Sequence, residues 1–168
     1  MKFYILPVLI LFSSLNLVSQ SINWVTMDKA LELQKNTPKN IMIDIYTTWC
    51  GPCKMLDKNT FTNKDLITFV NANYYAVKFN AEGNESVNYK NRLFENPNYD
   101  PAKAKRRNSA HQFSQYLGVR AYPTIVFLDD NAELIAPIPG YQTVQKIEIY
   151  LQLFKDQNKF RLYKISIC

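Results

Sequence analysis

The sequence contains only three cysteines and a single histidine. An exported scaffold held together by disulfides would need a larger and even set of cysteines, so such a scaffold is disfavoured. A zinc site would have to join Cys50 and Cys53 to two isolated residues, His111 and Cys168, whereas zinc motifs usually supply two close pairs. The shortage of ligands favours a redox role for Cys50 and Cys53, and we expect neither a metal nor a cofactor. Cys168 is interpreted as a free terminal thiol, with intermolecular pairing as the alternative.

The sequence also lacks an apolar run of the ~20 residues that a membrane-spanning helix usually needs. A shorter apolar run, Phe3 to Phe12, follows Lys2 and leads into small and polar residues. This pattern is typical of a secretory signal peptide, which we place at residues 1–20 with cleavage near Ser19 or Gln20. A periplasmic or secreted protein is therefore expected, with an uncleaved N-terminal membrane anchor as the alternative. No cysteine follows the run, which argues against lipid modification.

No internal repeat is found, and the length allows one domain, which we place at residues 21–158 with a tail at 159–168. The net charge is +6, but most of the basic residues are scattered along the chain. The exception is a cluster of four, which is interpreted as a solvated loop or as an electrostatic docking patch: Lys103, Lys105, Arg106 and Arg107. Because aromatic residues do not interleave with this cluster, we expect no nucleic-acid partner. A monomer is expected.

Strand-like and helix-like segments alternate along the first half of the chain. The pattern predicts a helix over 28–35, a buried strand over 41–46, helices starting at Cys50 and near Asn63, and a strand over 74–79. Met55, Leu56 and Phe61 are expected to contact the core. A strand, a helix and a further strand in this order describe a βαβ unit and a central sheet with helices on its faces.

Residues 81–108 are rich in polar residues and proline, and we interpret them as an insertion with an irregular helix around 87–94. A helix over 109–117 is expected to stop at Gly118. Strands over 124–128 and 133–138 should form a hairpin, with Pro137 at a sheet edge. An amphipathic helix over 143–154 completes the domain.

The run Trp49-Cys50-Gly51-Pro52-Cys53-Lys54 carries the predicted chemistry. A first cysteine at a strand-to-helix junction lies at a helix N-terminus, where free N–H groups and the helix dipole favour its thiolate. Cys50 is therefore the predicted nucleophile, and Cys53, shielded one turn further in, resolves the mixed disulfide. Pro52 suits the first helical turn. Trp49 is interpreted either as an apolar ledge beside an exposed sulfur or as a plain core aromatic.

Asp44 interrupts an otherwise apolar strand that leads into this run. A buried carboxylate there would have a raised pKa and could take the proton of Cys53 through water. The alternative is a strand-end carboxylate with a solvent path or a lysine partner. Its place immediately before the cysteine run favours the catalytic interpretation.

Several motifs, in this order along the chain, resemble those of the thioredoxin family. They are Asp44, the run from Trp49 to Lys54, Lys78 with Asn80, the segment from Gly118 to Thr124, and Gly140. The resemblance implies a single α/β thioredoxin fold, with a central mixed β-sheet flanked by helices and an insertion before the helix that precedes a cis-proline.

The same resemblance implies roles for further residues. Pro123 should be cis and packed against the disulfide, and the Tyr122 backbone should pair with an extended substrate. Lys78 should lie near Asp44. Gly51 and Pro52 should contact the substrate together with Trp49, and Gly140 should support the site.

The resemblance also implies an activity, namely thiol-disulfide exchange with protein disulfides. Gly-Pro between the cysteines resembles reducing members of the family, so a reductase supplied by a membrane electron donor is expected. An oxidase or isomerase, and a non-catalytic binding module, are the alternatives. The chain is similar to the C-terminal domain of transmembrane thiol-reductant transporters, and in part to membrane-tethered cytochrome-maturation thioredoxins. It departs from many thioredoxins at Tyr46, at Tyr122 and in the insertion.

Overall fold

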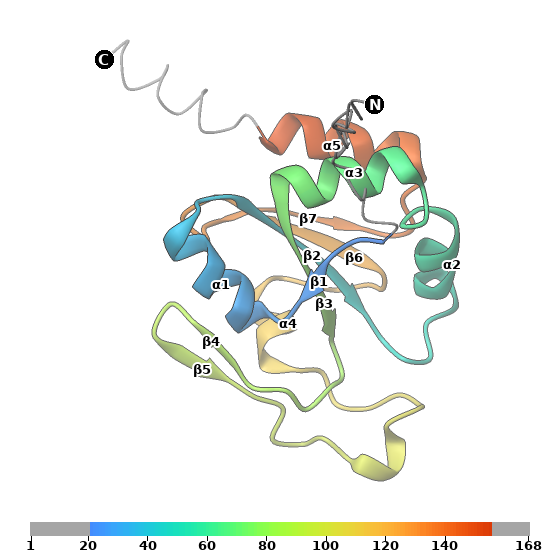
Figure 1. The fold of residues 1–168 in the computed structure, drawn as a ribbon. Coiled ribbons are helices and arrows are strands. Elements are labelled where there is room, and N and C mark those ends of the chain that lie inside the picture. Colours follow the sequence, from blue (N-terminus) through green and yellow to red (C-terminus); the bar gives the residue numbers. More distant parts are fainter. Residues whose placement is uncertain (1–20, 156–168) are drawn as a thin grey trace, which may run out of the picture.

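The computed structural model describes residues 21–155, which fold around one mixed β-sheet (Figure 1). The sheet order is β1-β3-β2-β6-β7, with β1 parallel to β3, β3 parallel to β2, and the last two strands antiparallel. The strands are β1 (Trp24–Val25), β2 (Asn40–Tyr46), β3 (Tyr74–Asn80), β6 (Thr124–Leu128) and β7 (Leu134–Pro139). The predicted signal peptide and C-terminal tail lie outside the described residues.

Helices cover both faces of the sheet, so the expected α/β architecture is confirmed. The helices are α1 (Met27–Asn36), α2 (Gly51–Asn59), α3 (Lys64–Asn73), α4 (Gln112–Tyr116) and α5 (Val144–Lys155). One core cluster joins the sheet to α1 and α4, and a second joins it to α2, α3 and α5. Within residues 21–155, no helix has the length and apolar character needed to cross a membrane.

The alternation of β2 between the two clusters positions the key carboxylate. Ile41, Ile43 and Ile45 belong to the cluster under α1 and α4, whereas Met42 belongs to the cluster under α2, α3 and α5. Because successive side chains of a strand point to opposite faces, Asp44 shares the face of Met42. It therefore lies on the side of the sheet that α2 covers.

The insertion contains a β-hairpin, so the expected irregular helix over 87–94 is wrong. Its strands are β4 (Val87–Tyr89) and β5 (Arg92–Phe94). Lys90 and Asn91 both have positive φ, at 51° and 60°, which is the backbone of a tight two-residue hairpin turn. The hairpin is followed by a short 3₁₀ helix, η1 (Pro101–Lys103). Val87 and Tyr89 are buried and the residue between them is exposed. This alternation is the two-residue period of a strand and not the period of a helix.

Three smaller expectations also need correction. Met55 is exposed rather than part of the core, because α2 turns Leu56 toward the core and Met55 toward solvent. Helix α4 is shorter than the expected 109–117, because His111 is its extended N-cap and its backbone N–H bonds to the Ala81 carbonyl at 2.8 Å. The two-residue strand β1 was not expected.

Candidate active site

Cys50 and Cys53 form a disulfide at the N-terminus of α2. Cys50 is the N-cap residue, with extended backbone, and its sulfur accepts a hydrogen bond from the Cys53 N–H at 3.1 Å. Pro52 occupies the first turn, where a backbone N–H has no intrahelical acceptor, so proline loses no hydrogen bond there. The N-terminal N–H groups and the helix dipole would stabilise a thiolate at Cys50 once the disulfide opens.

The two cysteines do not differ in exposure in this disulfide state. Both residues are 3 % exposed, whereas Gly51 and Pro52 between them are exposed. The expected contrast between an exposed outer sulfur and a shielded inner one is therefore wrong for the disulfide form. The loop at Gly51 and Pro52 is the part of the motif that solvent reaches.

A second loop contributes the proline that the sequence singled out. The Tyr122–Pro123 peptide bond is cis, and Pro123 is buried. The Pro123 carbonyl accepts a hydrogen bond from the Gly140 N–H at 2.7 Å, which ties this loop to the end of β7. Gly140 has a φ of 85°, a backbone conformation that glycine adopts without steric strain. Tyr122 contacts Trp49 edge to face, with ring centres 6.1 Å apart, so the proline loop and the cysteine loop meet there. A role of the Tyr122 backbone in binding substrate stays a prediction.

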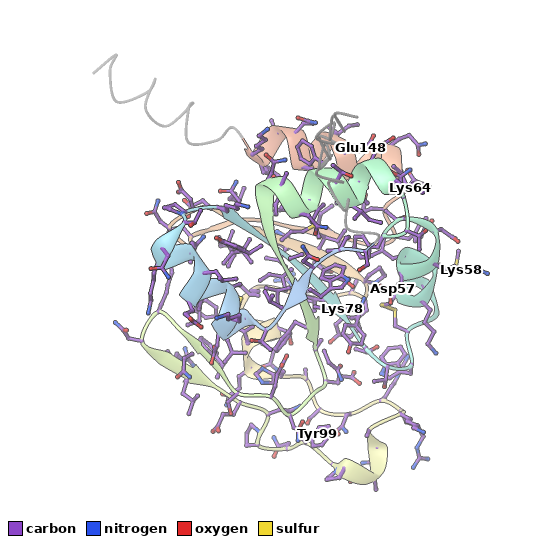
Figure 2. The ribbon with its side chains drawn as sticks, viewed as in Figure 1. Asp57, Lys58, Lys64, Lys78, Tyr99 and Glu148 are labelled. Atoms are coloured by element: carbon purple, nitrogen blue, oxygen red, sulfur yellow. A yellow bond between two sulfur atoms is a disulfide. The ribbon has the colours of Figure 1, made fainter. Side chains whose placement is uncertain are left out.

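Asp44 is held in an ion network that reaches α2. The Lys78 ammonium donates to Asp44 Oδ2 at 2.8 Å and also contacts the Asp57 carboxylate. Lys78 and Asp57 lie side by side in Figure 2. Rings of Trp24, Tyr46 and Phe61 surround the same ammonium. Lys78 is near Asp44 as the resemblance implied, and it adds a link to α2 that the sequence did not suggest.

Burial controls the ionisation of Asp44. Its side chain is 1 % exposed, and desolvation raises the pKa of Asp44 from 3.8 to about 6, although the charge and hydrogen bond of Lys78 oppose the rise. Burial lowers the pKa of Lys78, but the two carboxylates outweigh burial and the net pKa is raised. One oxygen, Asp44 Oδ1, has no hydrogen-bond partner among the described residues. A carboxyl group with this pKa can accept and release a proton near neutral pH.

Comparison with known proteins identifies the family of this arrangement. Residues 27–155 match the family model of the thioredoxin-like domain. The chain belongs to this family. Among curated proteins, no sequence matches it significantly.

Solved structures share the fold of this thioredoxin-like chain at low sequence identity. A DsbH oxidoreductase has a TM-score of 0.56 at 17 % identity, over 85 % of this chain and 93 % of its own. A thioredoxin from Thermus thermophilus has a TM-score of 0.58 at 13 % identity, over 79 % and 86 %. A putative disulphide-isomerase from Bacteroides thetaiotaomicron has a TM-score of 0.53 at 21 % identity, over 78 % and 93 %. The chain thus has a thioredoxin-like fold in which Cys50 and Cys53 form the disulfide-bonded cysteine pair. The resemblance to a transporter domain stays a prediction.

The insertion of this thioredoxin-like protein contacts the cysteine loop directly. The Trp49 indole donates to Glu82 Oε2 at 2.7 Å, and the backbone N–H of Asn108 donates to the same oxygen at 2.9 Å. The Arg107 guanidinium lies over the Trp49 ring, 4.7 Å from its centre. The Thr48 hydroxyl donates to the Ala104 carbonyl at 2.9 Å. Both ends of the insertion therefore meet beside Trp49.

Only part of this contact between the insertion and the cysteine loop was predicted from the sequence. Arg107 belongs to the basic cluster that was interpreted as a solvated loop or a docking patch, but no sequence signal placed it against Trp49. Glu82 was not singled out at all. Its only sequence signal is its position two residues after Asn80, at the start of the insertion.

His111 is a structural residue of the core. One ring nitrogen, Nδ1, accepts from the Phe113 N–H at 3.0 Å, and Nε2 lies 2.7 Å from the Glu85 carbonyl oxygen. Burial lowers the pKa of His111, so the neutral ring is favoured. In the part of the chain that the structure describes, no group of three or more His, Cys, Asp or Glu side chains is arranged to hold a metal ion. Cys168, the remaining candidate ligand, lies outside that part.

Proposed function

We propose that the protein is an exported thiol-disulfide reductase that acts on protein disulfides. In the reduced enzyme, the Cys50 thiolate attacks one sulfur of the substrate disulfide. A bond forms between Cys50 and that sulfur, and the other substrate sulfur leaves as a thiolate that takes a proton from solvent. The product of this step is a mixed disulfide.

Cys53 completes the reaction. Its thiol loses a proton to the Asp44 carboxylate through a bridging water, and the resulting thiolate attacks Cys50 Sγ. The mixed disulfide breaks and releases the second substrate thiolate, while the Cys50–Cys53 disulfide forms. Two electrons have then passed from the enzyme to the substrate. A membrane electron donor would return the enzyme to its dithiol form.

The observation that carries this proposal is the carboxyl group of Asp44. It is buried on the sheet face that α2 covers, it has a pKa of about 6, and Lys78 connects it to Asp57 of the helix that bears Cys53. A base is needed where a buried thiol must lose its proton, and the described residues offer this carboxylate on the correct face. The lysine partner Lys78 is also what a structural aspartate would have, and the pH dependence of the resolving step distinguishes the two roles.

The direction of electron flow is supported by the residues between the cysteines. Gly51 and Pro52 supply no charged or imidazole group that would further stabilise the Cys50 thiolate. A dithiol whose thiolate is strongly stabilised is a strong oxidant, because its reduced form is favoured. The absence of such a group in the loop favours a reducing pair.

Equilibration with a thiol buffer of known potential tests the direction. We expect a value near the about −270 mV of reducing thioredoxins, and a value near the about −120 mV of strong oxidants would refute a reductase. Protein-disulfide reduction should disappear in Cys50→Ser. Cys53→Ser should accumulate a mixed disulfide with its substrate, detectable by mass spectrometry. A Cys50→Ser variant that retained full activity would refute the mechanism.

A further inference from the structure

The insertion places a cationic segment beside the cysteine loop. We define the basic arm as residues 100–107, which contain four cationic side chains and one carboxylate and so carry a net charge of +3. Lys103 pairs with Asp100 at 3.3 Å. Within the described chain, Lys105, Arg106 and Arg107 take part in no ion pair, and all three are exposed. Three cations are therefore available to an anionic partner.

The basic arm is held in place rather than left as a free loop. The Ala104 carbonyl accepts from Thr48, two residues before Cys50, and Arg107 stacks on Trp49, one residue before it. At the end of the arm, Asn108 bonds to Asp100 through its side chain, at 2.8 and 3.0 Å. In Figure 1 the insertion approaches the loop between β2 and α2 at one end of the molecule. The charges thus have a fixed position relative to the cysteine pair.

We infer that the basic arm selects protein substrates that carry acidic residues close to the disulfide that is reduced. This inference rests on the reductase function proposed above and names its substrate class. Because the arm contacts Thr48 and Trp49, the two residues that precede Cys50, acidic side chains that flank the attacked cysteine of a substrate lie on the side of the arm. A cluster of positive charges raises the association rate of an anionic partner and lowers that of a cationic one.

A single-turnover experiment with three disulfide peptides tests the inference. The peptides share one disulfide and differ only in flanking residues, which are Asp and Glu, Asn and Gln, or Lys. Reduced full-length protein is mixed with each peptide, and the second-order rate constant is followed by tryptophan fluorescence at low and high ionic strength. No electron donor is required in this assay.

Two charge-reversal variants make a matched pair. Lys105→Glu/Arg106→Glu changes the arm, and Lys64→Glu/Lys146→Glu makes the same change of net charge on exposed residues of α3 and α5. Those helices lie at the end of the molecule opposite the insertion, and Figure 2 shows Lys64 far from Tyr99 of the insertion. Neither pair includes a residue that we place in the catalytic machinery.

The inference requires a specific pattern of rates. Wild type should reduce the acidic peptide about 10-fold faster than the neutral one at low salt, and salt should suppress the difference. The arm variant should lose this preference while its rate with the neutral peptide and its redox potential stay unchanged. The control variant should keep most of the preference.

Other outcomes would overturn the inference. Equal rates with the three peptides would do so while leaving the reductase function intact, whereas failure to reduce any peptide would refute that function itself. A changed redox potential in the arm variant would mean that the arm tunes the cysteines instead of docking substrate. Arm-dependent binding to phosphatidylglycerol vesicles or to single-stranded DNA, without a peptide preference, would assign the arm to another partner and refute the inference.

Discussion

Replacement of Asp44 by asparagine separates the chemical role of this residue from its structural role. The substitution keeps the shape of the side chain but removes the negative charge and the ability to accept a proton. Because the folded protein binds the Asp44 proton more tightly than the unfolded chain does, this group stabilises the fold fully below pH 3.8. That stabilisation is lost as the pH rises to about 6.

The size of the effect follows from the shifted pKa. The difference between 3.8 and about 6 corresponds to about 3 kcal/mol. The oxidised Asp44→Asn variant should therefore be more stable than wild type at pH 8 by about 3 kcal/mol, because the pKa of about 6 already includes the opposing attraction of Lys78. The difference should shrink toward zero near pH 4. Urea unfolding of both oxidised proteins across this range measures it.

The same variant should be a poorer enzyme. Loss of a positioned base slows proton transfer by roughly 100-fold or more, so release of substrate from the mixed disulfide should slow and should lose its inflection near pH 6. Asp57→Asn is the matched control, because Asp57 also contacts Lys78 but is far more exposed. It should keep the inflection. An Asp44→Asn enzyme that is more stable yet retains the inflection and the wild-type rate would refute the role of Asp44 as base.

Three further predictions concern the support of the site. In Lys78→Met, loss of the attraction to Asp44 should move the pH inflection of the resolving step above 6, as stopped-flow rates across the pH range would show. Gly140→Ala should lower the unfolding free energy by about 1 to 2 kcal/mol, because the backbone there has positive φ, whereas Gly51→Ala, with open space around the new methyl group, should not. Phe113→Ala should lower it by about 3 to 5 kcal/mol in urea unfolding, since its ring packs among buried aromatic rings of the sheet and the hairpin.

The sheet and the cysteine helix were predictable from sequence because local signals and tertiary packing agree there. The apolar run around Asp44 predicts a buried strand, and the resemblance of the motifs to those of the thioredoxin family implies the mixed sheet. Strand β1 escaped prediction because two residues, Trp24 and Val25, carry no measurable period. It forms because β3 offers a free parallel edge at Ala76 and Val77.

The insertion was harder to predict because its structure depends on contacts with distant residues. Two residues with positive φ, Lys90 and Asn91, are not the usual glycine-containing signal of a hairpin turn. Tyr89 is buried against the core and donates to the Ala132 carbonyl, a contact that no local pattern encodes. The network around Asp44 shows the same limit, since the lysine partner was predicted but Asp57 reaches it only through the packing of α2.

Asn96 explains how the fold accommodates the insertion without losing the geometry of the site. Its buried side-chain amide donates to the Gly83 carbonyl and to the Ser109 carbonyl, both at 2.9 Å. These acceptors lie near the two ends of the insertion, so one side chain holds the ends together and the chain leaves and rejoins the domain at nearly the same place. A loop with closely held ends can be lengthened at little entropic cost to the rest of the fold. The same closure fixes Asn108 beside Glu82 and Trp49, so the insertion begins and ends at the cysteine loop.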